Sequence, residues 1–155
     1  MTASAPDTPP AAPRAVILLP IVLLLHIAEE WFGGFPAWSA AILGSEISPE
    51  RFLSINALGL VIFVIGTLAA LLSPQMAWFG VSLAALVGVN GVLHGLASLV
   101  AGSYSPGTVT GVLLYIPLSA ILLRLFSDLL SRPVFAGSVL FGVLLHAVAT
   151  FSALQ

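Results

Sequence analysis

The stretch AVILLPIVLLLHIAEEWF, residues 15–32, decides the fold and raises the question of function. Its first eleven residues are all apolar, and a helix of this length, rising about 1.5 Å per residue, reaches most of the way across a ~30 Å hydrocarbon core. Because backbone polar groups in lipid must be satisfied internally, this stretch is predicted to form a transmembrane helix. The same helix nevertheless carries His26, Glu29 and Glu30, three ionisable side chains that lipid disfavours.

The composition of the whole chain also indicates an integral membrane protein. Of its 155 residues, 59% are hydrophobic and only 6% are charged, whereas soluble domains carry about 25% charged residues. Cysteine is absent from the sequence, which excludes disulfides, thiolate metal ligands and thiol nucleophiles. The four cations are all arginines scattered along the chain, which excludes a lysine Schiff base and a basic patch for nucleic acid.

Five apolar segments are long enough to cross a membrane, so the predicted fold class is an all-α, polytopic transmembrane helical bundle. Residues 33–51, between the first and second spans, are too short and too mixed to cross and are predicted to form an interfacial segment. Residues 1–14 are rich in Pro, Ala and Thr and are predicted to form a disordered tail ahead of a single transmembrane domain, 15–155. The five predicted spans are residues 15–32, 52–72, 76–101, 109–126 and 134–154.

Serine and proline mark where these spans begin and where they are distorted. Ser48, Ser73 and Ser105 each stand before a proline and a span, and serine is a good N-cap when proline takes the first helical position. Pro20 and Pro117 fall inside predicted spans and are expected to kink the first and fourth helices.

The polar side chains inside the spans share a depth. Counted at about 1.5 Å per residue from the side of the N-terminus, His26 lies roughly 18 Å deep, His146 roughly 20 Å and His94 roughly 27 Å. Positions three and four apart share a helix face, so His26 stands beside both glutamates of the motif. We predict one buried cluster, with Tyr115 of the fourth span at a similar depth: His26, Glu29, Glu30, Asn90, His94 and His146.

The two glutamates are the strongest argument that this cluster is functional. A lone intramembrane histidine or asparagine often serves only as a hydrogen-bond partner between helices, and Asn90 is interpreted as such a supporting residue. An ionised carboxylate at mid-bilayer, by contrast, costs several kcal/mol on any scale. Adjacent helical residues point about 100° apart, so the sequence does not decide which of Glu29 and Glu30 faces the cluster.

The motifs in these positions resemble those of a known family. HIAEE at residues 26–30 is an H-x-x-E-E string at the end of the first apolar helix, and FPAW follows at 35–38. Together with Asn90-x-x-x-His94 and YSPGTVT at 104–110, it resembles the HXXEE-motif family of small bacterial integral membrane proteins. That family is named for its motif and not for an activity. The resemblance therefore implies that His26, Glu29 and Glu30 are important, without implying a reaction.

The arginines predict how the bundle is oriented. Arg14, Arg124 and Arg132 fall on one side of the membrane and only Arg51 on the other. The positive-inside rule then places the N-terminus in the cytoplasm, and the resemblance implies the bacterial inner (plasma) membrane.

Imidazoles and carboxylates are the ligands that Zn²⁺ and Fe²⁺ accept, so the first hypothesis is a membrane-embedded metal-dependent enzyme, a hydrolase or an oxidoreductase. One divalent metal would bind His26, His94 and His146 with Glu29 or Glu30, and the second glutamate would act as general base. Tyr115 is a further candidate catalytic residue. The partner would be a membrane lipid or hydrophobic small molecule, such as a lipid ester, an amide or an isoprenoid, entering from the bilayer.

The same residues leave other functions open. Without a metal, Glu29 and Glu30 could divide into an acid and a base for an isomerase or cyclase. Histidines on facing helices also permit a haem or quinone carrier. A proton-coupled transporter or a purely structural protein remains a further hypothesis, as does a homo-oligomer.

Overall fold

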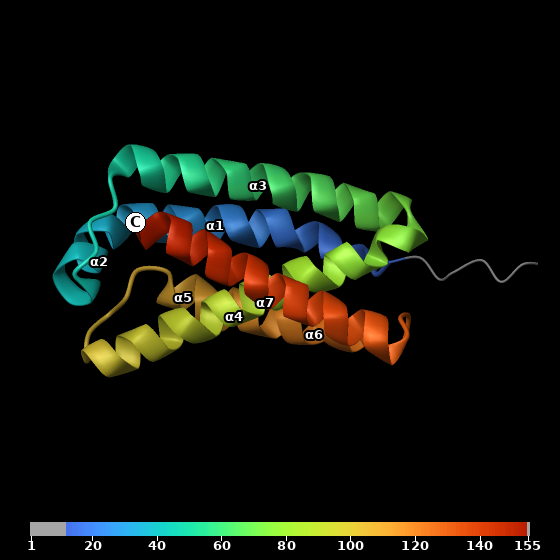
Figure 1. Ribbon diagram of the computed structural model, residues 1–155. Helices are drawn as coiled ribbons and strands as arrows, with labels where there is room; N and C mark the ends of the chain where they lie inside the picture. The colour runs from blue at the N-terminus through green and yellow to red at the C-terminus, as the bar shows by residue number, and fades with distance from the viewer. Residues whose placement is uncertain (1–11, 155) are drawn as a thin grey trace, which may run out of the picture.

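The computed structural model describes residues 12–154, and every regular element in that range is helical (Figure 1). Five helical segments are long and apolar enough to cross a membrane, which confirms the predicted all-α bundle. The elements in chain order are η1 (Arg14–Ile17), α1 (Leu18–Phe32), α2 (Phe35–Leu43), α3 (Pro49–Leu72), η2 (Pro74–Met76), α4 (Ala77–Ala101), α5 (Thr108–Thr110), η3 (Gly111–Tyr115), α6 (Ile116–Ser127) and α7 (Arg132–Leu154).

The observed spans begin slightly earlier than the predicted ones, because each helix starts at its polar punctuation and not at its first apolar residue. The nine-residue helix α2 forms where the interfacial segment was predicted, between left-handed glycines at Gly34 (φ 76°) and Gly44 (φ 68°). Most of the predicted tail lies outside the described residues, and Ala12, near its end, is buried.

The helices lie side by side in an elongated bundle with α4 at its centre (Figure 1). Helix α4 contacts α1, α3, α6 and α7, and five consecutive residues within it, 81–85, are all buried. Small residues permit this close approach: a Cβ on Gly91 would lie 2.5 Å from the carbonyl oxygen of Gly111. Helix α2, the α4–α5 connection and the C-terminus gather at one end of the bundle.

The outer surface of the bundle is apolar, as lipid requires. Large apolar side chains are exposed on several spans, for example Phe32 (86% exposed), Leu72 (82%) and Val100 (88%). Soluble monomers do not expose apolar surface on this scale. The composition, the five spans and this surface together make the chain a membrane protein.

The predicted serine caps hold for one of the three spans. The hydroxyl of Ser48 accepts a hydrogen bond from the backbone N–H of Arg51 (3.2 Å), so this prediction is confirmed. Ser73 uses its backbone carbonyl, which accepts from Met76 (2.9 Å), and not its side chain. The Ser105 prediction is wrong, because its hydroxyl does not cap the fourth span, which begins at Thr108. The Thr108 amide bonds to the backbone carbonyl of Ser105 (3.0 Å), and the next two amides bond to a side chain from another helix.

The two prolines inside spans differ in what surrounds them. Pro20 lies in the first turn of α1, just after the 3₁₀ turn η1, where a missing N–H costs little. Pro117 follows η3, a π-helical turn over Gly111–Tyr115. Proline lacks the amide N–H that would continue the α-helical hydrogen bonds, so these bonds are interrupted here and a π-turn forms. Such turns inside helices are frequent at functional sites.

Candidate functional site

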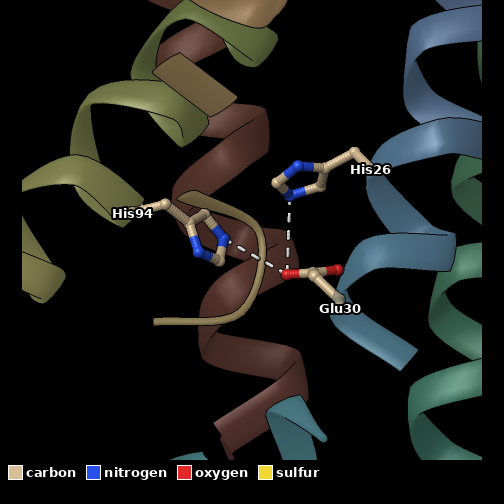
Figure 2. A group of neighbouring side chains, drawn as sticks. All are labelled: His26, Glu30 and His94. Atoms are coloured by element: carbon tan, nitrogen blue, oxygen red, sulfur yellow. Dashed lines mark ion pairs between the residues drawn. The ribbon is translucent and has the colours of Figure 1, made fainter. Parts of the chain in front are cut away.

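Three buried ionisable side chains from two helices meet at one point inside the bundle (Figure 2). The Oε1 atom of Glu30 lies 3.5 Å from Nε2 of His26 and 3.2 Å from Nε2 of His94. All three residues are buried, with exposed fractions of 6%, 2% and 7% respectively. His26 and Glu30 are one turn apart on α1, and His94 reaches them from α4. We call these three residues the triad.

The histidine rings are held by hydroxyl groups on the side away from Glu30. Nδ1 of His26 lies 2.7 Å from the Thr110 hydroxyl, and Nδ1 of His94 lies 3.5 Å from the Ser105 hydroxyl. When Thr110 accepts from Nδ1–H, the Nε2 atom of His26 carries the free lone pair that a metal ion would use. Both Nε2 atoms then face the same carboxylate oxygen.

These hydroxyls belong to residues 102–110, which comprise both the connection after α4 and α5, the first turn of the fourth span. We call this segment the strap. Gly107 of the strap has φ 97° and lies against both rings of the triad. A Cβ at this position would lie 2.7 Å from Cε1 of His94 and 2.8 Å from Cε1 of His26. Both the backbone conformation and the available space therefore require glycine here.

Gly107→Ala is expected to displace the strap from the two imidazoles. The left-handed conformation costs a non-glycine residue about 1–2 kcal/mol, and the clash with both rings adds to that cost. Thermal unfolding in detergent should show a clear loss of stability. Gly102→Ala is the matched control, because Gly102 is also left-handed (φ 61°) but has open space around its Cβ position. Equal losses in the two variants would contradict the role of the rings.

Glu29 binds the strap and not the histidines. Its Oε1 accepts from the Tyr104 hydroxyl (2.6 Å) and from the backbone N–H groups of Gly107 (3.1 Å) and Val109 (2.8 Å), and its Oε2 accepts from the N–H of Thr110 (2.6 Å). A carboxylate satisfies the free amides at a helix start and complements its dipole. Burial and the bond to Glu29 raise the pKa of Tyr104 to about 12, so its phenol stays a donor at physiological pH.

The structure thus answers which glutamate of the motif faces the histidines. Glu30 does, while Glu29 turns to the strap, as the ~100° step between adjacent helical residues allows. Of the five predicted ligands, the described residues bring together only the triad, whose ligand atoms lie within 4.8 Å of one another. Both oxygens of Glu29 are engaged by the strap, and His146 pairs elsewhere, so their roles as metal ligands stay predictions.

The remaining predicted residues share one cavity with the triad. This cavity of about 270 Å³ is lined by residues of α1, α2, α3, α4 and α7, including Asn90 and His146, and by Tyr115 at the end of the π-turn. The amide nitrogen of Asn90 lies 3.3 Å from Nε2 of His146. The ring of Tyr115 lies 4.4 Å, centroid to centroid, from the ring of His26. The shared depth predicted from the sequence therefore corresponds to a shared cavity.

Sequence reasoning missed the residues that hold the triad in place. Thr110 and Gly107 appeared only within the YSPGTVT motif, Ser105 there and as a predicted N-cap, and Phe35, whose ring lies 5.6 Å from that of His94, only within the FPAW motif of the interfacial segment. The one available signal was the density of hydroxyl residues in YSPGTVT, 104–110. No periodicity indicates that a loop folds back across two helices.

Comparison with known proteins gives one match. A family model described as "Protein of unknown function with HXXEE motif" matches residues 17–122. The matched region contains the triad, Glu29 and Tyr115, whereas His146 lies beyond it. No curated protein and no solved structure matches the chain.

Proposed function

The chain belongs to the HXXEE-motif family, and from its triad we propose that it is a membrane-embedded, metal-dependent enzyme acting on a lipid or isoprenoid substrate. The family description names no activity, so the proposal rests on the site itself. One observation carries it: two imidazole Nε2 atoms from different helices face a single buried carboxylate oxygen, beside an apolar cavity.

The distances within the triad support one metal ion. With zinc–ligand bonds of about 2.0–2.2 Å, neighbouring ligand atoms of a tetrahedral site lie about 3.3–3.5 Å apart. The two measured separations from Glu30 Oε1, 3.2 and 3.5 Å, agree with that spacing. Nε2 of His26 is buried and has no hydrogen-bond partner among the described residues, and the hydroxyls on the Nδ1 atoms are typical of the outer shell of a metal site.

Two histidines and one carboxylate leave positions open for water or substrate. The set matches the His₂Glu ligands of zinc hydrolases and the two-histidine, one-carboxylate set of non-haem Fe²⁺ oxygenases. A divalent ion here would activate water or polarise a substrate oxygen. Tyr115 and His146, in the cavity wall, are then the groups placed to exchange protons with the substrate.

The cavity position supports a substrate that enters from the bilayer. Its walls are formed largely by apolar side chains of five helices, and several of these side chains, such as Leu93, are also exposed on the outer face of the bundle. We further propose an N-terminus in the cytoplasm of a bacterial inner membrane, supported by the arginine distribution, and we leave a homo-oligomer as a prediction.

A second function for the same residues is metal-free acid–base catalysis. It is favoured by the direct contact of the Glu30 carboxylate with both imidazoles, which would let one proton be shared among three groups. Haem ligation between His26 and His94 is disfavoured, because their rings pack edge to face at 4.9 Å and leave no space for a macrocycle between them.

Metal analysis of the purified protein tests the proposal. Wild type is expected to hold about one equivalent of zinc or iron, and His146→Ala is expected to keep it, because His146 lies outside the triad. His94→Ala should lose it. Absence of metal from wild type, even after reconstitution with Zn²⁺ and anaerobic Fe²⁺, would favour the acid–base alternative. Loss of metal from His146→Ala would instead restore the wider ligand set predicted from the sequence.

A further inference from the structure

Buried polar atoms without partners gather in the cavity beside the triad. Among residues 12–154, five buried side-chain polar atoms have no hydrogen-bond partner, and four of them belong to residues that line this one cavity: His26, Trp38, Asn90 and Tyr115. The fifth, on Thr67, lies elsewhere. An unpaired buried polar group is costly, so native proteins keep few of them. Nε2 of His26 faces Glu30 at 3.5 Å and belongs to the triad, but the three on Trp38, Asn90 and Tyr115 indicate a further ligand that bonds to them.

The chemistry of these atoms indicates what the ligand must offer. The Trp38 indole N–H can only donate, and the Tyr115 hydroxyl can donate or accept. Asn90 uses one end of its amide on His146, so its other end faces no partner within the described residues, whichever way the amide is turned. A hydroxyl group satisfies all these cases, because it donates and accepts at the same oxygen.

The side chains around the cavity favour an uncharged head group over an anionic one. Its ionisable lining residues are Glu30 and the three histidines, and none of the four arginines is among the lining residues. A phosphate or carboxylate would therefore enter without a permanent positive side chain and would face the carboxylate of Glu30, which would also balance part of the charge of a metal ion on the triad. An uncharged polar group carries no such penalty.

We propose that this cavity binds an uncharged lipid bearing a hydroxyl group, which hydrogen-bonds with Asn90 and Tyr115 while the hydrocarbon chain lies along the apolar residues of α3 and α4. This inference rests on the proposed function, because both use one cavity, and it names the substrate class. Asn90 and Tyr115 become the residues that select the polar group, separate from the triad that would hold the metal.

Quenching of Trp38 fluorescence by brominated probes tests this. For this test, Trp31→Phe and Trp78→Phe are introduced, so that Trp38 in the cavity wall is the remaining tryptophan. The protein is then reconstituted in phosphatidylcholine nanodiscs. The probes are 12-bromododecan-1-ol, its methyl ether and 12-bromododecanoic acid. The alcohol should reach half-quenching at about tenfold lower mole fraction than the ether, the effect of one hydrogen bond, and the acid at pH 8 should quench least.

Asn90→Leu and Tyr115→Phe should each weaken quenching by the alcohol about tenfold. Leu99→Ala, on the lipid-facing side of α4 (78% exposed), should leave it unchanged. Tyr115→Phe removes only an oxygen, so it keeps the test valid if Asn90→Leu folds poorly. Equal quenching by alcohol and ether, stronger quenching by the acid, or unchanged quenching in both variants would overturn the proposal.

The same assay in Glu30→Gln separates this inference from the proposed function. If wild type binds no metal, and the preference for the alcohol is present in wild type and persists in Glu30→Gln, the hydroxyl site is supported while the metal proposal fails. A wild type that holds one metal ion but shows no such preference would overturn this inference alone.

Discussion

Glu30→Gln is expected to lower the metal affinity of the protein at least about 100-fold. The change replaces the one charged metal ligand of the triad, which faces both histidines, with a neutral amide of the same shape. Activity that depends on the metal should fall with it. The fold should survive, since a neutral side chain is easier to bury in a membrane than a carboxylate. The metal-free variant should therefore unfold at the same temperature as metal-free wild type, or higher.

Elemental analysis and competition with a chelator would measure the affinity, and thermal scans would measure stability. Glu46→Gln is the matched control: Glu46 is an exposed glutamate in the α2–α3 connection, outside the triad, and its variant should bind metal as wild type does. If Glu30→Gln binds metal as tightly as wild type, the triad is not the metal site.

Glu29→Ala is expected to lower the stability of the protein without removing a metal ligand. The change leaves the backbone N–H groups of Gly107, Val109 and Thr110 without their acceptor and removes the partner of the Tyr104 hydroxyl. Hydrogen bonds to a charged group contribute about 1.5–3 kcal/mol each, and loss of a helix cap alone costs about 1 kcal/mol. A loss on the order of 3 kcal/mol in the free energy of unfolding is therefore expected.

Graded variants distinguish this role from metal ligation. Tyr104→Phe removes one of the four bonds and should cost about 1.5 kcal/mol, and Glu29→Gln should lie between it and Glu29→Ala. Metal affinity should fall only in proportion to the loosening of the strap, because Thr110 then orients His26 less firmly. A Glu29→Gln variant of wild-type stability that has lost its metal would show instead that Glu29 is a ligand, as one reading of the sequence predicted.

Much of the fold follows from properties that are local in the sequence. The five spans, and the break after the first of them, were predictable because apolar length and helical rise alone determine what can cross lipid. The Ser48 cap was predictable because its partner, Arg51, is three residues away. The depth of His26, His94 and His146 followed from the same count and correctly placed them beside one cavity.

The assignment of roles within the cluster depended on contacts between distant segments. Glu29 bonds to residues about 75–81 positions away, and His26 to Thr110, 84 positions away. No helical period predicts that a strap returns across α1 to replace the expected Ser105 cap, or that a π-turn at Gly111–Tyr115 brings Tyr115 against His26. The sequence by itself determined that both glutamates lie on the first apolar span. Only the packing of the strap against α1 decided that one anchors the backbone and the other faces the histidines, because two adjacent side chains on a helix point in different directions and each takes the partner that the tertiary structure places there.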